Sequence, residues 1–154
     1  MTIIEHPIDS EEAKLLIQEL DAELYQRYPA HSVHGVNVEE FMKAGGRFFI
    51  VEIDNECIGC CALRPIDKSS AEIKRMYVRK AFRGRGISRS ILNHIESLAR
   101  ELGYSQLMLE TGDRQPEAQA LFQSNGYQQT ELFGEYVNDP HSICFKKELY
   151  TQRD

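Results

Sequence analysis

The fold of this chain is decided by the stretch Ile73-Lys74-Arg75-Met76-Tyr77-Val78-Arg79-Lys80-Ala81-Phe82-Arg83-Gly84-Arg85-Gly86-Ile87-Ser88-Arg89. Its β-branched and aromatic residues favour a strand that ends at Val78. From Ile87 as far as Leu102, apolar residues recur at helical spacing. The stretch therefore predicts a strand, a tight basic loop and the start of a helix.

The loop has the properties of a phosphate-binding loop. Gly84 and Gly86 lack the Cβ atoms that would keep an anion away from main-chain N–H groups. The helix that follows begins with unpaired N–H groups and the positive end of its dipole. The stretch also holds seven cations and no acid, in a chain of net charge -6. We therefore expect a specific polyanionic ligand rather than general affinity for nucleic acid.

Two common nucleotide-binding motifs fit this loop poorly. The third glycine of G-x-G-x-x-G is missing, and no Gly-Lys-Ser or Gly-Lys-Thr follows. The order Arg83-Gly84-Arg85-Gly86-Ile87-Ser88 instead resembles the R-x-x-G-x-G/A pyrophosphate loop of the GNAT superfamily, the acyl-CoA-dependent N-acyltransferases. Ser88 departs from the usual glycine or alanine but keeps its backbone N–H.

A second segment supports the resemblance. Glu117 to Tyr127 is similar to the A-x-x-L-Y-x-x-x-G-F helix-to-strand segment of the family, and the order and separation of the two segments match. Glu-Thr-Gly-x-x-Gln-Pro-Glu-Ala at Glu110 to Ala118, with the later Phe-Gly-x-Tyr and Asp-Pro, resembles a subgroup of small N-acetyltransferases. The resemblance covers the chain from its first strand to its last.

The remaining patterns predict an α/β protein with a mixed sheet. We expect one domain over residues 1–154, mostly antiparallel, with a parallel crossover from the strand ending at Val78 to Leu107–Thr111. Asp9 is expected to cap a helix that runs to about Tyr25. The other expected strands and helices are Thr2–His6, Val38–Ala44, Arg47–Asp54, Glu56–Arg64, Ala71–Val78, Ile87–Leu102, Gln115–Ser124, Tyr127–Leu132 and Ser142–Leu149.

The resemblance implies a site for acetyl-CoA as cosubstrate. In the family, the pantetheine arm pairs with the strand that matches Met76, Tyr77 and Val78. The pyrophosphate binds the loop that matches Arg83, Gly84, Arg85, Gly86, Ile87 and Ser88. The tyrosine that usually protonates the thiol matches Phe122, which cannot donate a proton.

The sequence offers more than one residue for the general base and for the proton donor. An attacking amine must lose a proton, and Glu72 or Glu110 could accept it. Tyr136, Tyr127 or solvent could supply the proton for the thiolate, and the backbone N–H of Met76 could donate to the oxyanion.

We expect the acceptor to be a small soluble amine held near Tyr28, His31, His34 and Tyr136. These side chains offer stacking and hydrogen bonds but little fixed charge. Neither nucleic acid nor membrane is an expected partner, because the chain outside the loop is acidic. The same groove could instead admit a protein lysine or N-terminus. A CoA-binding sensor without catalysis and a nucleotide or phosphosugar site are the rival functions, and the chain could be a monomer or a homodimer.

Composition agrees with a cytoplasmic enzyme. The sequence lacks a signal-peptide pattern at its start and an apolar run long enough to span a bilayer. Cys57 and Cys60 have metal-ligand spacing, but no second C-x-x-C exists. Because Cys57, Cys60 and Cys61 fall in a strand-like run, we expect buried free thiols and no metal.

The loop assignment makes a direct prediction. Gly86→Asp places a side chain and a negative charge where the pyrophosphate would bind, so it should weaken acetyl-CoA binding by at least about tenfold. Calorimetry measures the change. Unchanged affinity in a folded variant would show that the loop is misassigned.

Overall fold

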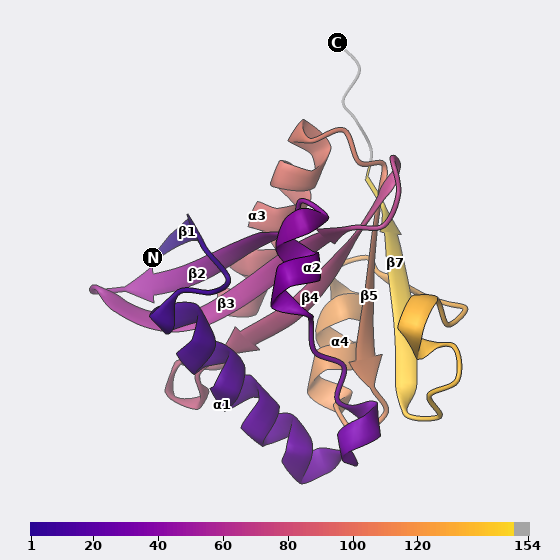
Figure 1. Ribbon diagram of the computed structural model, residues 1–154, viewed down its shortest axis with the longest axis horizontal. Coiled ribbons are helices and arrows are strands. Elements are labelled where there is room, and N and C mark those ends of the chain that lie inside the picture. Colours follow the sequence, from indigo (N-terminus) through magenta and orange to yellow (C-terminus); the bar gives the residue numbers. More distant parts are fainter. Residues whose placement is uncertain (150–154) are drawn as a thin grey trace.

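A seven-stranded mixed sheet forms the centre of the protein, in the order β1-β2-β3-β4-β5-β7-β6 (Figure 1). The computed structural model describes residues 1–149. The strands are β1 (Thr2–His6), β2 (Arg47–Ile53), β3 (Glu56–Pro65), β4 (Ser70–Val78), β5 (Gln106–Gly112), β6 (Gln128–Thr130) and β7 (Ser142–Glu148). Among the strands of the described residues, only β4 and β5 pair in parallel; every other neighbouring pair is antiparallel. This confirms the predicted mixed sheet and its crossover.

Helices cover both faces of the sheet. In Figure 1, α1 (Glu11–Arg27) and α2 (Val38–Lys43) lie in front of it, and α3 (Ile87–Glu101) and α4 (Pro116–Ser124) lie behind it. Successive residues of β2 and β3 therefore enter different cores: Phe48 and Cys60 pack with α1, whereas Phe49 and Cys61 pack with α3. Since both faces are covered, these strands are apolar almost throughout.

The ends of the predicted helices needed small corrections. Ser10, not Asp9, caps α1, because its hydroxyl accepts a hydrogen bond from the N–H of Ala13 at 3.2 Å. The helix continues to Arg27, two residues beyond the predicted end. Within residues 1–149, no helix combines the length and the apolar character needed to cross a membrane.

The ladder between β4 and β5 stops halfway along the strands. Its last pair is Ile73 with Leu109, although β4 continues to Val78 and β5 to Gly112. Figure 1 shows the two strands separating beyond this point. The sheet is therefore open between their C-terminal ends.

A bulge in β4 lies directly after that last pair. On the other side of the strand, Tyr77 pairs with Cys60 and Lys74 pairs with Ala62, so Arg75 and Met76 together face one residue of β3. Arg75 has a φ of 53°, in the left-handed region that non-glycine residues rarely adopt. Bulges of this kind re-aim side chains, commonly beside active sites.

Gly59 is required where β3 meets the end of β4. A Cβ there would lie 2.6 Å from the carbonyl oxygen of Tyr77. Because that neighbour is backbone, Gly59→Ala should lower the free energy of unfolding by about 1 to 3 kcal/mol. Chemical denaturation measures the change.

Gly35→Ala is the matched control for this measurement. Its Cβ would lie 3.9 Å from the nearest atom, a guanidinium nitrogen of Arg75, which is ordinary contact. We expect a change within about 0.5 kcal/mol. Equal stability of the Gly59→Ala variant and the parent would contradict the close approach.

Candidate active site

A groove opens where β4 separates from β5. Its walls come from α1, the end of β4, the basic loop with the start of α3, and α4. The residues that line it are Leu20, Glu23, Leu24, Arg27, Met76, Tyr77, Val78, Phe82, Arg83, Gly84, Gly86, Ile87, Ser88, Arg89, Gln115, Glu117, Ala118 and Leu121. Of the predicted cofactor residues, Arg85 and Phe122 lie outside this lining. The guanidinium of Arg85 sits over the ring of Phe82 at 5.1 Å.

The glycine loop has the geometry of an anion cradle. Gly84 and Gly86 have φ values of 81° and 76°, and no atom lies within 4 Å of the place a Cβ would occupy on either. Gly86 precedes α3 without a side-chain cap, and the first turn of α3 holds no acid. The first backbone N–H groups of the helix are therefore available to an anion. These residues fit a pyrophosphate.

Ion pairs reduce the positive charge of the basic stretch. Three of its cations pair with acids on α1; the pairs are Arg75 with Asp21, Arg79 with Glu19 and Arg83 with Glu23. Lys74 pairs with Glu135. Lys80, Arg85 and Arg89 have no salt bridge within residues 1–149. Less positive charge is free for a ligand than the sequence suggested, so the backbone N–H groups matter more.

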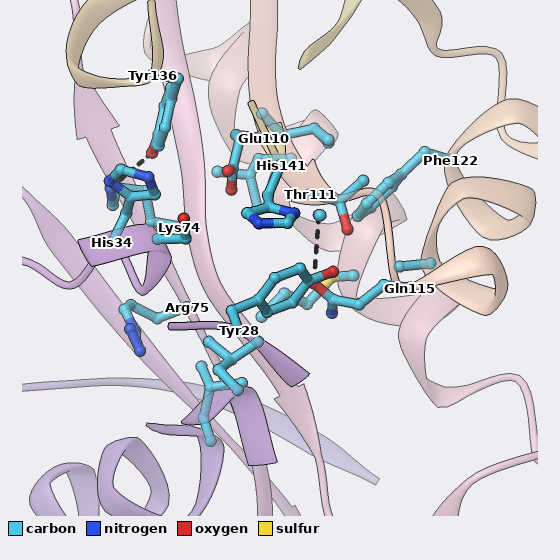
Figure 2. Close-up of a pocket in the computed structure, with 18 residues that line it drawn as sticks. Tyr28, His34, Lys74, Arg75, Glu110, Thr111, Gln115, Phe122, Tyr136 and His141 are labelled. Atoms are coloured by element: carbon cyan, nitrogen blue, oxygen red, sulfur yellow. Dashed lines mark hydrogen bonds between the residues drawn. The ribbon is translucent and has the colours of Figure 1, made fainter. Parts of the chain in front are cut away.

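A second cavity adjoins the groove at the C-terminal end of β5 (Figure 2). Both cavities share Leu20, Leu24, Met76, Gln115 and Ala118. The other residues that line this pocket are Tyr28, Ser32, His34, Ile73, Lys74, Arg75, Leu109, Glu110, Thr111, Gly112, Phe122, Tyr136 and His141. The β4 residue at the junction of the two cavities is thus Met76, which belongs to the bulge.

Three of the four predicted acceptor residues meet in this pocket. Tyr28, His34 and Tyr136 line it, although more than 100 residues separate Tyr28 from Tyr136. His31 is exposed and does not line it. The expectation of little fixed charge was wrong, because Lys74 and Arg75 from β4 also line the pocket.

His34 is held by a carboxylate that sequence reasoning missed. Its Nε2 lies 2.5 Å from Oδ2 of Asp139, whose other oxygen accepts hydrogen bonds from the hydroxyl of Ser32 and the N–H of His141. Burial alone would raise the pKa of Asp139, but these bonds bring it below its ordinary value. Asp139 therefore stays ionised and fixes the imidazole of His34. No sequence signal links residues 32, 34 and 139.

Glu110 lines the pocket, and its pKa is raised above the ordinary value of a carboxyl group. Burial raises its pKa from 4.5 to about 7. The hydroxyl of Ser142 donates a hydrogen bond of 2.5 Å to Oε2, and His34 and Lys74 also act to lower the pKa, but burial prevails. Glu110 can therefore exchange a proton near neutral pH.

Glu72 has a different environment. Its side chain is 1% exposed and does not line the pocket. Arg64 donates to one oxygen at 2.6 Å, and the hydroxyl of Tyr136 donates to the other at 2.5 Å. Burial and then Glu72 raise the pKa of Tyr136 far above its ordinary value. The Tyr136 hydroxyl and the Glu72 carboxylate are thus engaged with each other, although Tyr136 also lines the pocket.

The two aromatic residues in the second motif differ in their access to the site. Phe122 lines the pocket and packs against Tyr127 and Phe145, with ring centroids 6.0 and 6.1 Å away. Tyr127 lines neither cavity, and its hydroxyl donates to Glu96 of α3 at 3.0 Å. Tyr127 therefore lies outside the site.

Comparison with known families agrees with this architecture. Residues 13–127 match the acetyltransferase (GNAT) family, so the chain belongs to the GNAT acetyltransferases. It is 38% identical over 136 residues to a protein named IAA acetyltransferase from Azospirillum brasilense, covering 87% of this chain and 88% of that protein. It is 32% identical over 123 residues to YsnE of Bacillus subtilis, an uncharacterised N-acetyltransferase, covering 79% and 82%.

Solved structures share the fold. A Klebsiella pneumoniae protein classed as an acyl-CoA N-acyltransferase superposes with a TM-score of 0.82 at 28% identity, over 97% of both chains. A GNAT acetyltransferase from Elizabethkingia anophelis, solved with acetyl-CoA bound, gives a TM-score of 0.73 at 24% identity, over 96% of this chain and 97% of that one. The predicted family and fold are confirmed.

The place of Phe122 at the pocket wall generates a prediction. Phe122→Tyr adds one hydroxyl, and we expect turnover to stay within about threefold of the parent or rise modestly, because a thiol with a pKa near ~8.5 leaves without a dedicated donor. Steady-state release of free CoA measures this. The control variant Phe122→Ala removes the buried ring instead of adding a hydroxyl, so its free energy of unfolding should fall by about 3 to 5 kcal/mol. A large loss of activity in a folded Phe122→Tyr variant would show that the site excludes the hydroxyl.

Proposed function

We propose that this protein transfers the acetyl group of acetyl-CoA to the primary amine of a small soluble acceptor. The observation that carries the proposal is that the two cavities adjoin and share Met76 of β4, with Glu110 on the wall of the second. The groove would hold the pantetheine arm and the pyrophosphate. The second cavity would hold the amine.

The reaction proceeds by direct attack in a ternary complex. The neutral amine attacks the thioester carbonyl carbon, a C–N bond forms, and the C–S bond then breaks. Glu110 accepts the proton that the attacking nitrogen loses. Solvent supplies a proton to the departing thiolate, since Tyr136 donates its proton to Glu72 instead. The N–H of Met76 donates to the developing oxyanion.

Glu110 is preferred to Glu72 as the base because of its surroundings. A base needs a free oxygen near the substrate and a pKa close to the working pH. Glu110 lines the cavity with a pKa of about 7, whereas both oxygens of Glu72 are occupied by Arg64 and Tyr136. The alternative is a CoA-binding module without catalysis, motivated by the phenylalanine at position 122. The presence of Glu110 as a base argues against it.

The pH dependence of turnover tests the role of Glu110. Turnover in the parent should rise with pH through about 7, as Glu110 loses its proton. Glu110→Gln keeps a hydrogen-bond acceptor for Ser142 but accepts no proton, so kcat should fall by about a hundredfold or more. The rise of kcat with pH near 7, the acidic limb of the pH–rate profile, should disappear. An unchanged limb in the variant would exclude Glu110 as the base.

Stability gives an independent readout of the same variant. The pKa of Glu110 is raised on folding, so its contribution to stability is present below pH 4.5 and is lost as the pH rises through about 7. At pH 8, Glu110→Gln should therefore be more stable than the parent by about 1 to 3 kcal/mol. Glu72→Gln, the matched control, should lose stability by leaving Arg64 without its buried partner, and should keep the pH 7 limb.

A further inference from the structure

The β4 bulge gives the acceptor pocket two cations from consecutive residues. Side chains of neighbouring residues in a regular strand point to opposite faces. Four consecutive residues of β4, Ile73 to Met76, nevertheless line the pocket, and the bulge interrupts the alternation at Arg75 and Met76. Both cationic side chains are almost completely buried, at 3% exposed for Lys74 and 2% for Arg75.

The donors of Lys74 are already used by the protein. Its Nζ lies 2.6 Å from Oε1 of Glu135, 2.7 Å from the hydroxyl of Tyr136 and 3.9 Å from Glu72. Its charge is thus matched by neighbouring carboxylates. Lys74 orders Tyr136 and offers little to a ligand.

The guanidinium of Arg75 is different, because most of its donors have no acceptor among residues 1–149. Nη2 pairs with Asp21 of α1, which is 32% exposed. Nε is buried and has no hydrogen-bond partner within residues 1–149, and no other hydrogen bond from this guanidinium occurs there. A buried donor without an acceptor costs free energy, so an acceptor brought by a ligand would be bound favourably. A non-glycine residue in the left-handed region adds a second cost that is typical of functional positions.

We propose that Arg75 binds a carboxylate carried by the acceptor, so that the substrate is an amino acid or a closely related amine with a carboxylate. The inference rests on the proposed transferase function. A guanidinium matches the planar geometry of a carboxylate. A phosphate is disfavoured, because Asp21 already neutralises much of the charge of Arg75. In addition, Glu110 lines the same pocket, and Asp139 contacts His34 on its wall.

The charges of such an acceptor would match the two sides of the pocket. In Figure 2, Glu110 and Arg75 lie apart, with Lys74 between them. The amine of the acceptor would lie toward Glu110, its base, and the carboxylate toward Arg75. Leu24, Leu109 and Phe122 contribute apolar wall, which favours an amino acid with an apolar side chain.

A matched acceptor panel tests the inference. The panel holds the twenty amino acids, each with its amide and its decarboxylated amine, and the phosphonate analogue of leucine; acetylation is followed by CoA release. The parent should prefer its best amino acid over the amide and the decarboxylated amine by at least about tenfold in kcat/KM. In Arg75→Met this ratio should fall to about one. Arg75→Lys should keep part of it, and KM for acetyl-CoA should stay unchanged in both.

Asp21→Asn is the control variant. It removes the ion pair that could otherwise be the whole role of Arg75 but keeps the guanidinium, so the preference for the carboxylate should remain. Loss of the preference in Asp21→Asn, or its retention in a folded Arg75→Met, would overturn the inference.

The panel also separates the inference from the proposed function. Equal or better use of amines without a carboxylate would overturn the inference and leave the transferase function intact. A preference for the phosphonate would overturn it in favour of a phosphorylated acceptor. Acetyl-CoA binding without acetylation of any panel member would count against the proposed function itself.

Discussion

The parallel hydrogen bonds between β4 and β5 stop at Ile73 and Leu109, and the whole site depends on that interruption. Beyond this pair, Met76, Tyr77 and Val78 have no partner on β5 within the described residues, although the carbonyl of Val78 accepts a hydrogen bond from Nε of Arg83. A ligand with an extended, amide-containing arm can occupy the gap. The bulge at Arg75 begins where the pairing ends, so one local change in the strand both opens the groove and turns side chains into the acceptor pocket.

Burial and pairing give the ionisable groups around this gap different properties. Glu72 and Glu110 are the same kind of residue on adjacent strands, yet Glu72 is held by Arg64 and Tyr136, whereas Glu110 has only the hydroxyl of Ser142 as a hydrogen-bond donor within the described residues. Pairing with Arg64 holds the carboxylate of Glu72 in place, and burial raises the pKa of Glu110. Two carboxylates in such different environments can serve different roles in one site.

Helix α1 combines structural and electrostatic roles. Its acids pair with three cations that follow one another at intervals of four residues, Arg75, Arg79 and Arg83. These contacts hold the helix against the open edge of β4, where Leu20 and Leu24 form part of both cavities. They also pair three of the seven cations of the basic stretch with acids of the same helix. The last of these cations, Arg83, lines the cofactor groove while bound to Glu23.

The sequence by itself determined the element order, the parallel crossover and the glycine loop, because strand, turn and helix signals are local in the chain. It also indicated that Phe122 replaces a tyrosine. It predicted Glu110 as a candidate base, and Tyr28 and His34 as residues near the acceptor. It did not distinguish Glu110 from Glu72, since burial and ion pairing depend on residues 8 to 64 positions away. The tertiary structure alone decided that Asp139 holds His34 and that Arg75 faces the pocket. A one-residue bulge changes which face each side chain occupies, and nothing in the residue types at positions 73 to 78 marks where it falls.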